Sequence, residues 1–119
     1  MKLVYFSRTG NVESFVHKLN LPDTFQIESG NETLDEPFVI ITFTDGYGEL
    51  PEEVETFLEN NAQNITGVAS SGDKSYGDAY CLAADLISDT YGVPILGKFE
   101  FDGTDDDVKA FLDAFSALS

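Results

Sequence analysis

The chain has few residues that can bind a transition metal or form a cross-link. Cys81 is its only cysteine, His17 its only histidine, and tryptophan is absent. A single cysteine excludes an internal disulfide and a cysteine-based metal site. No second histidine stands three or four residues from His17 to complete a metal-binding pair. We therefore expect Cys81 to be a small hydrophobic residue inside a helix and His17 to be a surface helix residue.

Positive charge is also scarce. Six Lys and Arg residues stand against 22 Asp and Glu residues, which gives a formal net charge of −16. Nucleic-acid binding requires clustered cations, and these six are scattered, so we expect no nucleic-acid partner. The acidity either keeps the protein soluble or steers it towards a basic patch on a protein partner.

Long apolar runs are missing as well. No stretch approaches the length of a membrane span and no signal-peptide pattern opens the chain, so we expect a soluble, cytoplasmic protein with no membrane partner. A length of 119 residues leaves room for one domain, spanning 1–119. Ten Phe and five Tyr residues supply the large side chains of its core.

The sequence alternates between strand-like and helix-like apolar patterns. Strands are predicted at 3–6, 24–28, 38–43, 65–70 and 95–101, and helices at 12–19, 51–58, 79–87 and 104–115. Only the link through 32–36 lacks a clear helix. Such alternation indicates a parallel sheet covered on both faces, and right-handed crossovers favour the strand order 2-1-3-4-5. The predicted fold is therefore α/β, a three-layer αβα sandwich around a five-stranded parallel sheet.

Three polar, glycine-bearing loops follow the first, third and fourth predicted strands. In this topology they meet at the sheet edge where strand order reverses, which is where ligands bind. The loop at 7–12 suits a phosphate, because it offers two hydroxyls, a glycine and the free N–H groups of a helix start. Neither the dinucleotide-binding G-x-G-x-x-G pattern nor a loop ending in Gly-Lys-Ser/Thr is present.

The other two loops each place a tyrosine beside glycine. Tyr47 lies between Gly46 and Gly48, and Tyr76 precedes Gly77. Two aromatic walls suit a flat ring such as isoalloxazine, since offset stacking adds about 0.5–1.5 kcal/mol beyond area burial. The glycines let backbone groups reach the polar edge of that ring.

These loops resemble those of a known family. Ser-x-Thr-Gly-Asn after the first strand is similar to the phosphate loop of flavodoxins, and residues 45–48 and 71–80 resemble the NrdI family of small flavodoxin-like proteins. The resemblance spans essentially the whole chain and implies a flavodoxin-like fold with flavin mononucleotide (FMN) as cofactor. It assigns the phosphate to Ser7, Arg8, Thr9, Gly10, Asn11 and Val12, and the ring to Thr44, Asp45, Gly46, Tyr47, Gly48, Ser71, Gly72, Asp73, Ser75, Tyr76 and Gly77. Val12 stands where long-chain flavodoxins carry a second Thr, so backbone donors must contribute more.

The resemblance also implies a function. The family is associated with class Ib ribonucleotide reductases and supports assembly of the dimanganese–tyrosyl radical cofactor in their small subunit. Reduced FMN reacts with O2 and supplies a superoxide-type oxidant. The expected partners are therefore the reductase small subunit, O2 and an unidentified flavin reductant. The chemistry takes place on the flavin, with no catalytic side chain and no metal bound by this chain.

Three alternatives remain open at this point. A general electron-shuttle flavodoxin has the same fold and cofactor. A receiver-type signalling domain shares the sheet, and Asp45 and Lys98 fit its phosphoacceptor and lysine, although Ser7 and Arg8 stand where its Mg²⁺-binding acidic pair is expected. The third alternative is a flavodoxin-like scaffold that has lost its cofactor.

Two hypotheses concern residues near the ring. Asp45, Asp73 and Asp78 are expected to place anions there, and neutralising Asp45 or Asp73 is expected to raise the potential of the semiquinone/hydroquinone couple. Gly46 and Gly48 allow a peptide flip that would follow the oxidation state of the flavin.

Overall fold

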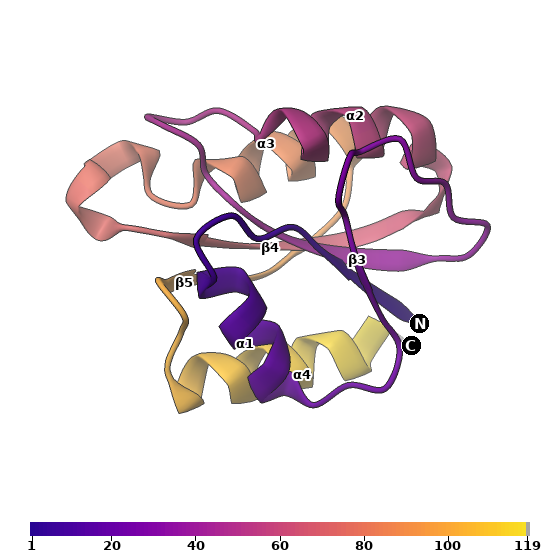
Figure 1. The fold of residues 1–119 in the computed structure, drawn as a ribbon. Helices are drawn as coiled ribbons and strands as arrows, with labels where there is room; N and C mark the ends of the chain where they lie inside the picture. The colour runs from indigo at the N-terminus through magenta and orange to yellow at the C-terminus, as the bar shows by residue number, and fades with distance from the viewer. Residues whose placement is uncertain (119) are drawn as a thin grey trace.

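A parallel sheet with helices on both faces forms the centre of the molecule (Figure 1). The structure, a computed structural model, describes residues 1–118. The strands are β1 (Lys2–Tyr5), β2 (Thr24–Gln26), β3 (Phe38–Phe43), β4 (Ile65–Gly72) and β5 (Ile95–Glu100). The α-helices are α1 (Asn11–Leu19), α2 (Glu52–Asn61), α3 (Leu82–Tyr91) and α4 (Asp105–Leu118), and two 3₁₀ helices are η1 (Ala62–Asn64) and η2 (Lys74–Ala79). The strand order is β2-β1-β3-β4-β5 with every neighbouring pair parallel, which confirms the predicted fold.

The central strand β3 is apolar on both faces because each face is covered. Phe38 and Ile40 belong to a core cluster with residues of α2 and α3. Val39 and Ile41 belong to a second cluster with residues of α1 and α4. Figure 1 shows the same division, with α2 and α3 on one side of the sheet and α1 and α4 on the other. The alternation of strand side chains therefore produces two separate cores.

Aromatic stacking fixes α1 against the sheet. The ring of Phe15 on α1 stacks on that of Phe99 on β5, with centroids 3.8 Å apart and planes 12° apart. Phe111 on α4 meets Phe15 edge-on at 5.9 Å. Because Phe15 lies in the second turn of α1, these contacts also hold the start of that helix in place.

The link between β2 and β3 contains no helix, as predicted, and is held by polar side chains instead. The Glu32 carboxylate accepts hydrogen bonds from the backbone N–H groups of Glu28, Ser29 and Gly30 at 2.8–3.1 Å. Asn61, buried at the end of α2, donates to the Glu32 carbonyl and accepts from the Leu34 N–H. Side chains thus supply the partners that a helix would have given this backbone.

The sequence prediction was wrong at the start of the third long helix. Residues 74–79 form η2, and α3 begins only at Leu82, so Cys81 is not inside a helix but at its N-cap, with φ 53°. Leu86, within the predicted helix 79–87, is exposed. Strand β4 runs two residues further than predicted, to Gly72. Thr104 caps α4, since the Asp107 N–H donates to the Thr104 hydroxyl and the Thr104 N–H donates back to the Asp107 carboxylate.

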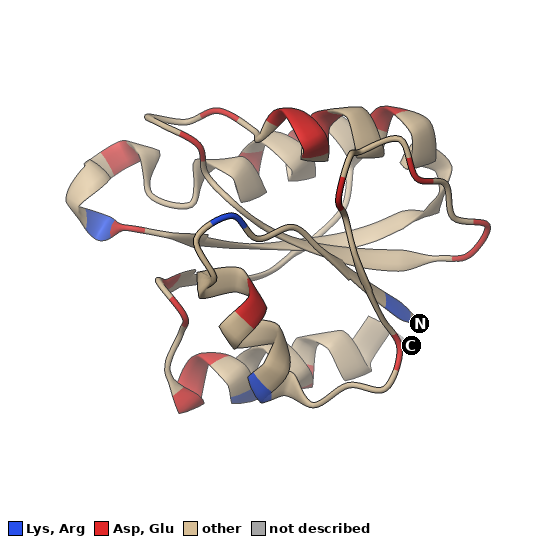
Figure 2. Ribbon diagram, viewed as in Figure 1, with Lys and Arg blue, Asp and Glu red and all other residues tan. Residues whose placement is uncertain are grey.

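Acidic residues are spread over the helices and loops of both faces (Figure 2). Each of these basic side chains forms an ion pair with Asp or Glu: Lys2, Arg8, Lys18, Lys98 and Lys109. The cations are therefore largely neutralised locally, and the remaining surface is negative. His17 is exposed on α1, as expected. Within residues 1–118 no helix is both long and apolar enough to cross a bilayer.

Candidate functional site

The carboxyl ends of β1, β3 and β4 surround a cavity of about 390 Å³. That volume lies within the roughly 300–1,000 Å³ typical of small-molecule sites. The loops after these three strands all contribute to its wall, as the topology predicts. Its lining is Ser7, Arg8, Thr9, Asn11, Val12, Phe43, Thr44, Asp45, Gly46, Ser71, Gly72, Asp73, Tyr76, Ala79, Cys81 and Phe101.

The first loop leads directly into α1 and leaves its amide donors free. Gly10 is the N-cap of α1, with φ 98°, a left-handed conformation that favours glycine. It has no side chain to cap the helix, and the Ser7 hydroxyl instead accepts the Glu13 N–H at 3.2 Å. Among residues 1–118, no protein group accepts a hydrogen bond from the N–H groups of Gly10, Asn11 and Val12. These donors and the Thr9 hydroxyl can bind an anion.

The second loop forms a closed turn. The Asp45 N–H donates to the Glu49 carbonyl at 2.8 Å, and the Glu49 N–H donates to the Asp45 carbonyl at 2.9 Å. Gly46 and Gly48 both have positive φ, at 53° and 132°. Just before the turn, the Thr44 hydroxyl accepts the Ala83 N–H at 3.0 Å. Thr44 therefore caps α3 from a distant part of the sequence.

The third loop begins where β4 approaches α3 closely. A Cβ on Gly72 would lie 2.8 Å from the Cys81 sulfur and 2.9 Å from the Cys81 nitrogen, so only glycine fits. Asp73 follows and accepts the Ser75 N–H, which caps η2. This hydrogen bonding from Ser75 holds the pKa of the Asp73 carboxyl below its ordinary value, against a smaller effect of burial. Asp73 is therefore an anion at neutral pH.

Tyr47 and Tyr76 contact each other instead of forming two separate walls of the cavity. Their ring centroids are 4.9 Å apart and their planes lie at 79°, an edge-to-face contact. Tyr76 lines the cavity and is 42% exposed, whereas Tyr47 lies outside the lining and is 81% exposed. No planar ring fits between them in this arrangement, so a ligand ring must either lie to one side of the pair or separate it.

The structure brings most of the predicted site residues to this cavity and leaves a few outside. Gly10, Tyr47, Gly48, Ser75 and Gly77 do not line it. Gly10, Gly48 and Gly77 shape the loops through positive φ, and Gly77 interrupts η2 with φ 59° and ψ −121°. Their contribution is to the backbone path and not to the wall itself.

Sequence reasoning missed four residues of the wall. They are Phe43, Ala79, Cys81 and Phe101. Phe101 follows β5, is 49% exposed and has φ 51°. Its backbone is fixed on both sides, because its N–H donates to the Gly72 carbonyl and its own carbonyl accepts from the Ser71 hydroxyl. The only sequence signal was an aromatic residue at the end of a strand, in a loop that the topology does not assign to the site.

Cys81 is a buried part of the wall. Its sulfur donates weakly to the Ser70 carbonyl at 3.3 Å and to the Phe99 carbonyl at 3.6 Å. Burial raises the pKa of the Cys81 thiol above its ordinary value, outweighing the opposing effect of its hydrogen bonds. The neutral thiol acts here as a small packing group.

Charge pairing does not support a receiver-type site. Lys98 forms an ion pair with Asp85 at 2.7 Å, and Asp45 forms one with Arg8 at 3.1 Å. Asp45 and Lys98, which would be the phosphoacceptor and the lysine of a receiver domain, therefore pair with other side chains and not with each other.

The cavity fits FMN at both ends. Free backbone donors and the Thr9 hydroxyl at the start of α1 match a phosphate group. Tyr76 and Phe101 offer exposed aromatic surface to a planar ring, and Gly46 and Gly72 allow its edge to approach the backbone.

Comparisons with known proteins agree with this arrangement. The family model described as NrdI Flavodoxin like matches residues 3–113. Protein NrdI of Macrococcus caseolyticus is 45% identical over 111 residues, which cover 93% of this chain and 85% of that protein. Protein NrdI of Bacillus licheniformis is 49% identical over 111 residues, covering 93% and 84%.

Solved flavodoxins share the fold. A short-chain flavodoxin associated with a bacterial microcompartment has a TM-score of 0.73 at 23% identity, covering 98% of this chain and 94% of that one. A flavodoxin of Streptococcus pneumonia has a TM-score of 0.69 at 25% identity, covering 98% and 95%. The family model and the curated relatives show that this chain belongs to the NrdI flavodoxin-like family, whose fold these solved flavodoxins share.

Proposed function

We propose that this protein holds FMN in the cavity and supports assembly of the dimanganese–tyrosyl radical cofactor in the small subunit of a class Ib ribonucleotide reductase. The observation that carries the proposal is the meeting of three loops in an NrdI-family chain, with free donors at one end and aromatic surface at the other. When bound and reduced, the flavin supplies electrons to O2 and so provides a superoxide-type oxidant.

The residues of the first loop bind and orient the phosphate. The Thr9 hydroxyl and the N–H groups of Gly10, Asn11 and Val12 would donate to its oxygens. The positive end of the α1 dipole favours the negative charge by about 0.3–1 kcal/mol at an exposed helix start. Ser7 holds the loop in shape, because its hydroxyl already accepts the Glu13 N–H.

The residues of the other two loops, together with Phe101 after β5, would hold the ring and limit access to it. Tyr76 and Phe101 would offer the ring aromatic surface, and Gly46 and Gly72 would let it approach backbone groups. Buried Cys81 closes the inner wall and excludes water from that side. The Asp73 carboxylate, which lines the cavity, would place a negative charge near a bound ring.

The surface charge supports a basic protein partner. Most basic side chains are ion-paired, and acidic residues are spread over the helices and loops (Figure 2), so the net charge of −16 gives the protein a negative field. Such a field accelerates association with a basic patch and weakens as salt screens it. Association with the small subunit is therefore expected to slow as ionic strength rises.

Radical formation in the partner tests this function. The protein is loaded with FMN, desalted, reduced without oxygen and mixed with a manganese-loaded class Ib small subunit before O2 is admitted. Tyrosyl radical, measured by electron paramagnetic resonance, is expected only when the reduced protein, the subunit and O2 are all present. Oxidation of the flavin without radical would instead favour the electron-shuttle alternative. A colourless protein that retains no FMN would reject both functions.

A further inference from the structure

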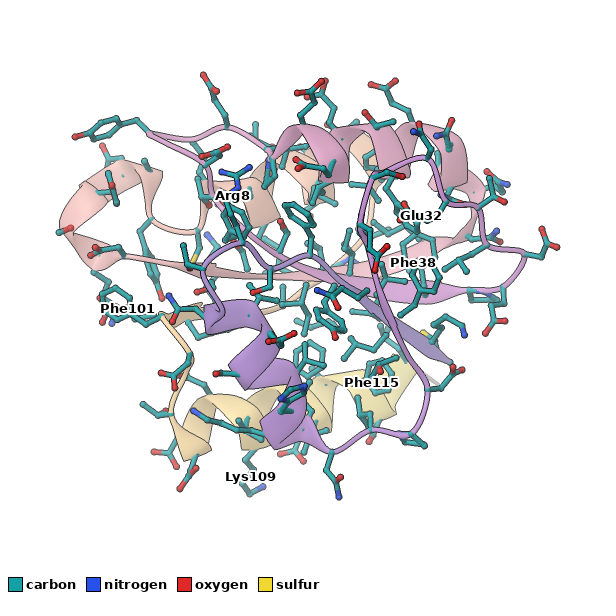
Figure 3. The ribbon with its side chains drawn as sticks, viewed as in Figure 1. Arg8, Glu32, Phe38, Phe101, Lys109 and Phe115 are labelled. Atoms are coloured by element: carbon teal, nitrogen blue, oxygen red, sulfur yellow. The ribbon has the colours of Figure 1, made fainter. Side chains whose placement is uncertain are left out.

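The side chain of Arg8 leaves the loop to which it belongs. Its Nη1 lies 3.1 Å from Asp45 Oδ2, and its Nη2 lies 3.8 Å from Glu53 Oε1. Its guanidinium carbon stands 5.2 Å from the ring centroid of Phe43. Figure 3 shows Arg8 pointing away from α1, towards the segment after β3 and the start of α2. All three contacts are therefore with the end of β3, the turn after it and the start of α2.

Asp45 is the base of the closed turn 45–49. Its backbone pairs with Glu49 in both directions, so the position of Asp45 sets the position of the residues between them. The turn is pressed against α3, since a Cβ on Gly48 would lie 2.6 Å from the Leu82 side chain. An ion pair with the Asp45 side chain therefore restrains the position of the whole turn 45–49.

The charge of Arg8 is already matched. Arg8 is the only basic residue in the cavity lining, and two carboxylates lie within 4 Å of its guanidinium. The face of Phe43 adds a favourable cation–π contact. A phosphate at the start of α1 would have to compete with all three partners for this side chain.

We propose that Arg8 is a positioning residue that holds the 45–49 turn over the ring end of the cavity through Asp45, and is not a phosphate ligand. This inference rests on the proposed FMN site. It follows that Arg8 contributes equally to the binding of FMN and of riboflavin, which has the same ring and no phosphate. Preference for FMN over riboflavin then comes from the neutral donors of residues 9–12.

A double-mutant cycle measured with both ligands tests this role. Dissociation constants for FMN and riboflavin are measured by flavin fluorescence quenching for the wild type, Arg8→Gln, Asp45→Asn and the double variant. Lys109→Gln is the matched control, because it removes one positive charge and one ion pair, with Asp113, on α4 (Figure 3). Circular dichroism verifies that each variant is folded, and Arg8→Lys tests for rescue by charge alone.

Riboflavin affinity gives the decisive result. We expect Arg8→Gln and Asp45→Asn each to weaken riboflavin binding about two- to fivefold, the range for an exposed ion pair. The double variant should be no weaker than either single one, because both remove the same contact. Arg8→Lys should recover part of the loss, and Lys109→Gln should leave riboflavin binding unchanged.

A phosphate-binding role for Arg8 predicts the opposite pattern of affinities. If Arg8 binds phosphate, Arg8→Gln weakens FMN binding alone and Asp45→Asn tightens it by releasing the guanidinium; either result overturns the inference. Unchanged affinity for both ligands in Arg8→Gln overturns it too. A wild-type protein that binds neither flavin rejects the proposed function itself, and with it this role, before any variant is compared.

Discussion

The hydroxyl of Thr44 accepts a hydrogen bond from the backbone N–H of Ala83 at 3.0 Å, which links the loop after β3 to the first turn of α3. The residue at the N-cap of α3, Cys81, makes no side-chain cap hydrogen bond. Thr44 therefore does from another strand what an N-cap residue ordinarily does locally. This hydrogen bond therefore joins the second loop of the cavity to α3, the helix that follows the third loop.

We predict that Thr44→Val, which keeps the shape and removes the acceptor, lowers the free energy of unfolding by about 1 kcal/mol, as loss of a helix cap does. Urea denaturation measures the change. Thr44→Ser keeps the hydroxyl and should recover most of the stability. A loss confined to Thr44→Ser, which removes the methyl group and keeps the hydroxyl, would assign the effect to packing of the methyl group instead.

The Glu32 carboxylate predicts a pH-dependent loss of stability in acid. Burial raises its pKa, but hydrogen bonds from the N–H groups of Glu28, Ser29 and Gly30 outweigh burial and hold the pKa below the ordinary 4.5. A carboxyl whose pKa is lowered by folding stabilises the protein above its unfolded pKa. That contribution is lost as pH falls from about 4.5 through the lower folded value.

Glu32→Gln is therefore expected to cost on the order of 1 kcal/mol at pH 7 and progressively less below pH 4.5. Denaturation at a series of pH values measures the difference between variant and wild type. Asp35→Asn is the control, since it removes a charge from the same link. A difference that stays constant into acid would contradict this assignment.

The fold was predictable because it follows from apolar periodicity. Strand β3 is apolar on both faces and α1 on one, and these patterns fix the layers and the order of the sheet. The error at Cys81 arose because Ala79 continues the spacing of the α3 apolar face. At Gly77 the backbone leaves the helical conformation, and apolar periodicity does not reveal such a change.

The site was predictable only as a set of loops. The topology brings the ends of β1, β3 and β4 together, so most of the predicted residues line one cavity. It does not say which way a long side chain points, and Arg8 crosses to Asp45. It also does not predict contacts between loops, such as Tyr47 with Tyr76, or the left-handed turn that brings Phe101 to the wall.

The close approach at Gly72 predicts a large effect of one methyl group. In Gly72→Ala the new Cβ would meet the Cys81 sulfur and nitrogen at 2.8 and 2.9 Å, so the start of α3 must shift. We expect a loss of about 1–3 kcal/mol in the free energy of unfolding, typical of overpacking. Gly97→Ala on neighbouring β5 meets nothing within 4 Å and should be neutral or slightly stabilising. Urea denaturation of the two variants makes the comparison, and equal effects would contradict it.

The different positions of the two tyrosines predict different effects on FMN binding. Tyr76 lines the cavity and Tyr47 does not. We expect Tyr76→Leu to weaken FMN binding about two- to tenfold, because a stacking contact contributes roughly 0.5–1.5 kcal/mol. Tyr47→Leu should cost less. Fluorescence titration with FMN measures both, and a larger loss for Tyr47→Leu would show that the bound ring separates the pair and contacts Tyr47.

The charge of Asp73 predicts the direction in which the flavin potential changes. Hydrogen bonding from Ser75 lowers the pKa of Asp73, so the carboxylate is ionised at neutral pH, and it lines the cavity. A nearby anion disfavours the addition of negative charge to the ring. Asp73→Asn should therefore raise the midpoint potential of bound FMN, and Asp45→Asn should raise it as well. Asp113→Asn, on α4 and outside the lining, changes the net charge by the same amount and should leave the potential nearly unchanged. Spectroelectrochemical titration of the three variants separates a local effect from a general one, because a general effect would shift all three potentials equally.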